Sequence, residues 1–332
     1  MIPNQWYVVL ESKQVGKKPI GVLRMGEKMV FWRDDQGRVV CFRDRCAHRG
    51  VQLSQGQVIG GRLQCPFHGF EYDPSGRVTA IPANSRAAPV PEVFRVPRYP
   101  TYEAHGFIWM WWGENPPADL APPRFFPDLD ETFVYATIID PWNAHYSRVI
   151  ENQLDVVHVP FVHRNTIGRG ERTVVDGPGL QWVEDDLFYI YVFNRQEDGT
   201  PARKPSQVPV PPTDREFKLE FRFPNLWQNY INRKVRIVAA FVPVDESRTL
   251  LYLRFYQNFL LVPVLGKLVA WAAMPFNRLV AHQDRRVVET HQPQPSGLRI
   301  GERLIAGDQP IIEYRRRVEE LKEAARRRGV GF

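Results

Sequence analysis

The stretch of sequence that decides the fold is Cys-Ala-His-Arg-Gly at residues 46–50, followed after fourteen residues by Cys-Pro-Phe-His-Gly at residues 65–69. Each segment joins one cysteine to one histidine and lies among short β-rich runs with turn residues between them. Thiolates suit iron–sulfur clusters or zinc, and imidazoles suit zinc, copper or iron. The two segments therefore predict a metal centre held by two loops of a β domain.

Two kinds of metal centre can use the ligand set Cys46, His48, Cys65 and His68. Zinc sites usually pair Cys with Cys and His with His along the chain. Here each pair is mixed, so both cysteines can bind one iron while both histidines bind the other. That division of ligands defines a Rieske [2Fe–2S] centre. We predict this cluster, and a zinc-stabilised binding module without redox activity is the alternative.

Residues 1–115 resemble a Rieske [2Fe–2S] domain through these two segments, the second of which continues to Phe70. Rieske proteins of respiratory complexes carry additional cysteines inside both segments, at the positions where this chain has Val51 and Phe67. The chain therefore resembles the oxygenase branch instead. The third cysteine, Cys41, lies outside both segments, and we expect an ordinary buried strand residue there.

The composition of the first 115 residues predicts an all-β domain. Turn sequences at 34–37 and 73–76 separate β-rich runs, and such runs occur at 6–10, 28–32, 38–42 and 106–112. Five prolines then occur between residues 116 and 127. Proline clusters are typical of stiff connections, so we expect a linker over 116–130 and a second domain over 131–332.

The second domain has the pattern of strands flanked by helices, without a regular βαβ alternation. We expect strands at 132–139, 180–193, 216–231, 235–244 and 249–259. Helices are expected over 143–158 and near 262–290 and 310–328. This order is typical of an α+β domain with an antiparallel sheet.

A second group of metal-ligand residues begins at Asp155, which is followed by His158 and His163. Asp155 and His158 share one helix face if the helix continues to Val159. We expect Pro160 to end that helix and His163 to fold back towards His158 from a turn.

A second carboxylate could complete this group. Asp284 lies between the apolar pairs 279–280 and 287–288 and can therefore face inward. Together with His158 and His163 it would form the triad of two histidines and one carboxylate that leaves positions on Fe(II) open for O₂. Glu289, and less strongly Glu151, compete for the place of the carboxylate.

The spacing of Asn152, Asp155, His158 and His163 is similar to the catalytic motif of Rieske oxygenase α subunits. This resemblance, which covers nearly the whole chain, implies a helix-grip catalytic domain and Asp284 as the third ligand of a mononuclear Fe(II). It also implies a head-to-tail homotrimer in which an aspartate bridges the cluster of one subunit and the iron of its neighbour. Asp155 matches that aspartate, and Asn152 is a secondary candidate for the site.

The sequence therefore predicts an oxygenase component that activates O₂ and oxidises a small aromatic or apolar substrate by monooxygenation, hydroxylation or O- or N-demethylation. A cis-dihydroxylating dioxygenase is the alternative within the family. A Rieske electron carrier is the alternative of another class, although its chain would end near residue 115. No G-x-G-x-x-G fingerprint occurs, so we expect a separate NAD(P)H-dependent reductase, a ferredoxin or both as partners.

Composition and charge restrict the remaining partners. The net charge is +7, but the basic residues of 315–328 alternate with glutamates, as in a solvated helix, and we expect no nucleic-acid partner. Three cysteines and no signal-peptide pattern indicate the cytoplasm. The apolar stretch 259–274 contains Pro263 and Lys267 and falls short of the ~20 residues of a membrane span. We expect no transmembrane span, and contact of this stretch with a membrane stays open.

Overall fold

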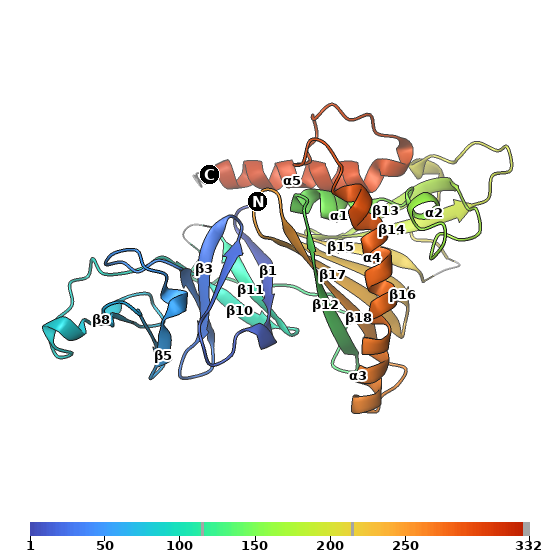
Figure 1. Cartoon of the computed structure of the whole chain (residues 1–332). Coiled ribbons are helices and arrows are strands. Elements are labelled where there is room, and N and C mark those ends of the chain that lie inside the picture. Colours follow the sequence, from blue (N-terminus) through green and yellow to red (C-terminus); the bar gives the residue numbers. More distant parts are fainter. Residues whose placement is uncertain (114–115, 214–215, 328–332) are drawn as a thin grey trace. The chain divides into compact units, whose positions relative to one another are not determined.

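The computed structural model describes residues 1–113, 116–213 and 216–327 (Figure 1). The described residues divide into two compact units, one of residues 1–124 with 243–245 and the other of residues 125–242 and 246–327. The boundary between Arg124 and Phe125 falls inside the stretch for which we expect a linker. Among the described residues, no helix is long and apolar enough to cross a membrane.

The N-terminal unit is built from three small antiparallel sheets, with the strand orders β1-β11-β10, β2-β3-β4-β9 and β5-β6-β7-β8. The strands are β1 Gln5–Glu11, β2 Ile20–Arg24, β3 Glu27–Arg33, β4 Val39–Arg43, β5 Gln57–Ile59, β6 Arg62–Gln64, β7 Glu71–Tyr72, β8 Val78–Ala80, β9 Arg98–Tyr99, β10 Thr101–Ala104 and β11 Phe107–Trp112. The expected turn after β3 is present, and the Asp34 carboxylate closes it by accepting the N–H groups of Gln36 and Arg38.

The hairpin of β3 and β4 separates two hydrophobic cores. Side chains alternate across a strand, so Val40 and Phe42 enter one core while Val39 and Cys41 enter the other. The first of these cores also contains Cys46 and Cys65. Cys41 thus lies on the far side of the hairpin from the other two cysteines.

The second unit contains a seven-stranded sheet with the order β12-β18-β17-β16-β15-β14-β13. Its strands are β12 Val134–Trp142, β13 Val174–Glu184, β14 Leu187–Arg195, β15 Lys218–Arg222, β16 Leu226–Asn232, β17 Val235–Pro243 and β18 Thr249–Gln257. The single strands expected at 180–193 and 216–231 were wrong, because each stretch spans a turn between two paired strands. Apolar residues continue on both sides of these turns and hide them from a periodicity argument.

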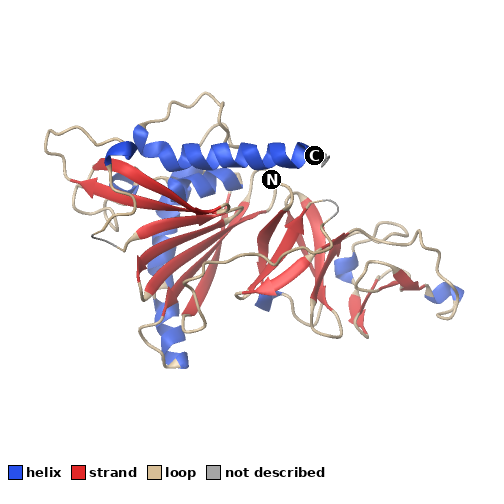
Figure 2. Cartoon of the chain, turned by 180° about the vertical axis from the view of Figure 1, so that it is seen from behind, coloured by secondary structure: helices blue, strands red, loops and turns tan. Residues whose placement is uncertain are grey.

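Five helices of this unit are described: α1 Tyr146–Leu154, α2 Val159–Val162, α3 Pro263–Ala272, α4 Met274–Val288 and α5 Gln309–Arg327. α3 and α4 pack near β12 at one end of the sheet, and α5 contacts β13 at the other end. Figure 1 shows α4 crossing the sheet. Figure 2 gives the opposite view, in which the strands lie in front of α4. The mixed α+β architecture with antiparallel sheets confirms the expected fold class.

A buried network of ion pairs fastens α1 to α5. Arg315 on α5 donates from Nε and Nη2 to the two carboxylate oxygens of Glu151 on α1, at 2.6 and 2.9 Å. Arg148 lies 3.1 Å from the same carboxylate, and both arginines also pair with Glu302. Every charge in this network has an opposite partner, which is the condition under which charges can be buried.

We predict that Arg315→Met lowers the free energy of unfolding of the second unit by about 3–5 kcal/mol, because it leaves the Glu151 carboxylate buried without its bidentate partner. Urea denaturation followed by tryptophan fluorescence measures this change. Arg327→Met is the matched control, since Arg327 is exposed and pairs with Glu323 of the same helix. Equal stability of the two variants would contradict the importance of the network.

Candidate metal centres

The two loops that carry the Cys/His pairs share one backbone conformation. In each loop the cysteine N–H donates to the carbonyl five residues later, and the cysteine carbonyl accepts the N–H of the glycine four residues later, at N···O distances of 2.8 to 3.1 Å. Those glycines, Gly50 and Gly69, have φ of +73° and +72°. Residues with a side chain rarely adopt this φ. The same Cys-x-x-x-Gly turn is therefore built twice.

The loops place the two kinds of ligand at different depths. The side chains of Cys46 and Cys65 are buried, whereas those of His48 and His68 are exposed. The two imidazole rings lie side by side, with centroids 4.8 Å apart. This donor set fits a [2Fe–2S] group, of which the two buried cysteines would hold one iron and the two exposed histidines the other.

Tyr72 fixes the buried side of this centre. Its hydroxyl accepts the N–H of Ala47 at 3.0 Å and lies 3.1 Å from Sγ of Cys46. Burial and the neighbouring Cys46 raise the pKa of Tyr72 well above its ordinary value. The phenol therefore keeps its proton and can donate it to the sulfur. Burial also raises the pKa of the Cys65 thiol, so a bound metal must replace that proton.

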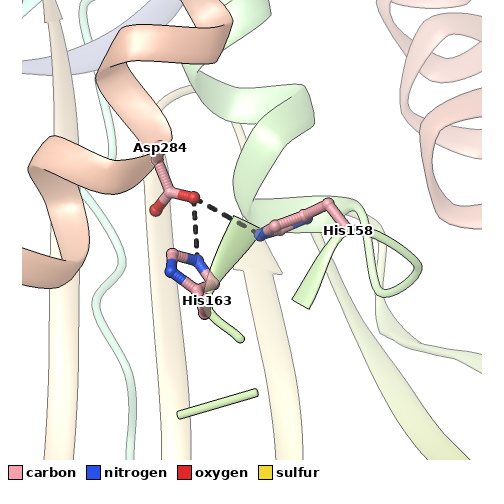
Figure 3. Close-up of side chains that lie close together, drawn as sticks. All are labelled: His158, His163 and Asp284. Carbon is pink, nitrogen blue, oxygen red and sulfur yellow. Dashed lines mark ion pairs between the residues drawn. The ribbon is translucent and has the colours of Figure 1, made fainter. Parts of the chain in front are cut away.

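His158, His163 and Asp284 converge in the second unit (Figure 3). Oδ1 of Asp284 lies 2.9 Å from Nε2 of His163 and 3.4 Å from Nε2 of His158. One potential ligand atom of each residue lies within 4.8 Å of the others. The sequence expectation that these three residues could meet thus agrees with their positions.

The hydrogen bonds around His163 indicate that a cation belongs between these atoms. Nδ1 of His163 lies 2.8 Å from Oε1 of Gln283, an oxygen that can only accept. Nδ1 therefore carries the proton of the neutral ring, and Nε2 turns a lone pair towards Oδ1 of Asp284. That buried oxygen has no hydrogen-bond partner among the described residues. Two lone pairs at 2.9 Å repel unless a proton or a metal ion lies between them.

The pKa values of His158 and Asp284 also reflect the close approach of carboxylates to imidazoles. Burial alone would lower the pKa of His158, but the carboxylates of Asp155 and Asp284 outweigh it and raise that pKa to about 9. Burial would likewise raise the pKa of Asp284, whereas the two histidines leave it lowered. The carboxylate is therefore ionised at neutral pH, and a metal cation competes with protons for the imidazoles.

The local fold around Asp155 differs from the expected continuous helix. α1 ends at Leu154, and Asp155 is its C-cap. Asp155 then accepts the N–H groups of Val157 and His158, at 2.6 and 3.1 Å. The separate helix α2 begins after His158, so Pro160 lies in its first turn, where the missing N–H costs nothing. The expectation that Pro160 ends a helix was wrong.

The Asp155 carboxylate still reaches the metal ligands. Its Oδ1 lies 3.6 Å from Nδ1 of His158, the ring nitrogen opposite the one that faces Asp284. Burial raises the pKa of Asp155, but the hydrogen bonds and charge of His158 outweigh burial, so the net shift is downward. Asp155 can thus orient His158 as an anion, and its partly exposed side chain also reaches solvent.

The competing glutamates have other partners. Glu289 accepts the N–H of Asn143 at 2.8 Å, and Glu151 belongs to the ion network under α5. Neither is in the group formed with the two histidines. Gln283 and Tyr72 were missed as site residues by the sequence argument, because each acts through tertiary contacts that no spacing rule marks.

A cavity of about 920 Å³ adjoins the histidines and Asp284. Alternate residues of β16 and β18 form its floor, namely Trp227, Asn229, Ile231, Leu251, Leu253 and Phe255. Another wall consists of Ala273, which precedes α4, and of the α4 residues Phe276, Asn277, Val280 and Ala281. The lining is mainly apolar, with the amides of Asn152, Asn194 and Asn229 among it, and each amide has one atom without a hydrogen-bond partner in the described parts of the chain.

Comparison with known proteins assigns both units to families. Residues 5–100 match the Rieske [2Fe-2S] domain, and residues 142–324 match the vanillate O-demethylase oxygenase C-terminal domain. Methylxanthine N1-demethylase NdmA of Pseudomonas putida is 27% identical over 92% of this chain and 83% of its own length. Chlorophyllide a oxygenase of Chlamydomonas reinhardtii is 37% identical, but the match covers 50% of this chain and 25% of that protein.

Solved structures agree with this assignment at the level of the fold. The structure of Pseudomonas putida NdmA superimposes with a TM-score of 0.77 over 98% of this chain and 92% of its own, at 24% identity. The C-terminal family match alone covers more than half of the chain. A [2Fe–2S] cluster, a mononuclear iron and O₂ are the cofactors and co-substrate that these two domains imply. The chain therefore belongs to the Rieske-type oxygenases that carry the vanillate O-demethylase oxygenase C-terminal domain.

Proposed function

We propose that this protein is a monooxygenase component that inserts one oxygen atom of O₂ into an organic substrate. The observation that carries this proposal is the convergence of His158, His163 and Asp284 on the wall of a mainly apolar cavity. Three protein ligands on an iron leave further positions for O₂, and the cavity can hold a substrate beside them.

The two donor sets divide the chemistry. In this proposal Cys46, His48, Cys65 and His68 hold the [2Fe–2S] cluster, while the two histidines and Asp284 hold the iron. When bound, the cluster supplies single electrons and the iron activates O₂. A zinc-stabilised binding module would not require the second donor set. An electron carrier would not require the oxygenase domain of residues 142–324.

The residues of the chain have positioning roles in this chemistry. Gln283 fixes the ring of His163 through a hydrogen bond at Nδ1, and the Asp155 carboxylate, 3.6 Å from Nδ1 of His158, orients that ring through its charge. The apolar walls bind the substrate and exclude water, while the free amide atoms of Asn152 and Asn229 can orient a polar substituent. Asn152, the secondary candidate, thus has a substrate-positioning role here.

Demethylation is the form of monooxygenation that we favour, because NdmA and vanillate O-demethylase are among the relatives. Oxygen insertion into a C–H bond of an O- or N-methyl group yields a hydroxymethyl group that leaves as formaldehyde. The second oxygen atom becomes water by taking up two electrons and two protons. A cis-dihydroxylase would instead place both oxygen atoms in the product, and isotope-labelled O₂ separates the two reactions.

The path of electrons suggests a homotrimer with head-to-tail contacts. His48 and His68 are exposed at the tip of the N-terminal unit, and the partly exposed Asp155 contacts the iron ligand His158. We propose that Asp155 bridges these histidines of one subunit and the iron of the next. A separate NAD(P)H-dependent reductase, with or without a ferredoxin, supplies the electrons. The three cysteines form no disulfide, which is compatible with the cytoplasm as the location.

We predict that Tyr72→Phe lowers the reduction potential of the cluster by several tens of millivolts, because hydrogen bonds to cluster sulfurs stabilise the reduced form. Redox titration of the visible absorption band measures the shift. Tyr102→Phe is the control, since Tyr102 is an exposed residue of β10 in the same unit. An unchanged reduction potential in Tyr72→Phe would contradict a hydrogen bond between Tyr72 and the cluster.

We predict that Asp155→Asn leaves iron and sulfide contents unchanged and slows electron transfer between the centres at least about tenfold. The reason is that the neutral amide lacks the negative charge with which Asp155 orients His158. The measurement is the rate at which O₂ reoxidises the cluster after chemical reduction. Asp130→Asn is the control, because Asp130 is an exposed residue of the same unit that accepts the N–H and the hydroxyl of Thr132. Wild-type reoxidation in Asp155→Asn would rule out the bridging role.

A further inference from the structure

α3 buries its small residues and exposes its large ones, the reverse of a helix that covers a core. Gly266 and Ala270 face the sheet, and a Cβ on Gly266 would lie 2.6 Å from the carbonyl oxygen of Leu260. On the opposite side Leu268 and Trp271 are 56% and 70% exposed. Close approach of the helix to the sheet thus turns the apolar side chains outward.

The exposed stripe continues into α4. Ala273 joins the two helices and has helical φ and ψ of −75° and −19°, so the helical spacing runs on through it. Asn277, Ala281 and Asp284 form the buried side of α4. The α3–α4 apolar face, as we call the exposed side, consists of Leu261, Val262, Val264, Leu265, Leu268, Trp271, Phe276 and Leu279. Contiguous apolar surfaces of this kind mark interaction sites.

Basic residues border this face. Lys267 and Arg278 are exposed, and residues eleven apart lie on the same side of a helix with 3.6 residues per turn. No Asp or Glu occurs anywhere from Phe259 to Gln283. An apolar helix face with Trp, Leu and Phe, edged by Lys and Arg alone, is complementary to the interface of an anionic phospholipid bilayer.

Two other observations favour a lipid surface. α3 has ten residues, a length of about 15 Å, so it can lie in the interface but cannot span the ~30 Å of a bilayer core. A two-fold contact between copies would set Lys267 and Arg278 against the same basic residues, without an acidic residue of this face to neutralise them.

The face is continuous with the cavity beside the iron ligands. Phe276 lines that cavity and is also 52% exposed. Its neighbours Ala273 and Val280 line the same wall. A molecule dissolved in the lipid would thus meet an apolar path from the docked face to the cavity.

We propose that the α3–α4 apolar face docks the protein on an anionic phospholipid surface, from which the cavity takes a lipophilic substrate. The first half of this proposal, docking on the lipid surface, is inferred from the α3–α4 apolar face alone. The second half, uptake of a lipophilic substrate (the substrate half), also rests on the function proposed above. The two halves have separate tests.

Vesicle flotation of the holoprotein tests the docking. Wild type floats with vesicles that contain phosphatidylglycerol, and the double variant Leu268→Glu/Trp271→Glu loses about a hundredfold in partition coefficient. Lys267→Gln and Arg278→Gln each lose about fivefold at low salt. Val93→Glu, which changes an exposed valine of the N-terminal unit, is the matched control. Neither Leu268 nor Trp271 lines the cavity, so iron and sulfide contents stay at wild-type values.

Two results would overturn the docking: wild type could fail to float, or the double variant could float as wild type does. If wild type fails to float, light scattering in the absence of lipid could also find smaller assemblies for the double variant than for wild type. That result would assign the face to contacts between copies of this chain.

Oxidation of vesicle lipids tests the substrate half. Vesicles made from the total lipid extract of the source cells are incubated with wild type, an electron donor and O₂. We expect products heavier by one oxygen or lighter by one methylene, and their loss in the double variant. Wild type that floats and reoxidises its cluster with O₂, yet forms no such product, would overturn the substrate half. Failure of reoxidation would instead count against the proposed function.

Discussion

The arrangement on which the catalytic unit depends is a buried carboxylate that faces two imidazole nitrogens. Asp284 is ionised, and its Oδ1 points at Nε2 of both His158 and His163. Such a group is stable only when positive charge lies between the three atoms. Protons supply this charge in the metal-free protein, and a divalent metal ion supplies it better. The fold therefore has to hold three side chains from two distant parts of the chain at fixed distances.

The rest of the unit provides that rigidity. α4 presents Asp284, and the short helix α2 presents the two histidines as its N-cap and its C-cap. The ion network of Arg148, Glu151 and Arg315 prevents α1 from shifting along α5. Gln283, the neighbour of Asp284, also fixes the ring of His163, so one turn of α4 supplies both a ligand and the support of another ligand. In the N-terminal unit, backbone hydrogen bonds hold the two cluster loops in place.

The sequence predicted the donor sets better than the elements that carry them. Ligand types and spacings are local properties, so the Cys/His pairs and the two histidines were visible directly. The carboxylate was harder to predict, because Asp284 on α4 and Glu289, the C-cap of α4, both lie near apolar residues of that helix, and only the packing of the helix distinguishes the two candidates. The end of α1 and the two hairpins were misjudged, since tertiary contacts overrode local periodicity there. Tyr72 and Gln283 could not be found, because each makes its contact across a sheet or between distant helices.

The most direct test of the account is the iron and acid-labile sulfide content per chain of anaerobically purified protein, for wild type, Asp284→Ala and Glu289→Ala. The account predicts about three iron and two sulfide in wild type and in Glu289→Ala. Asp284→Ala should keep the sulfide and lose about one iron, because the two histidines alone hold the metal too weakly. Zinc without sulfide in wild type, or loss of one iron in Glu289→Ala but not in Asp284→Ala, would contradict it.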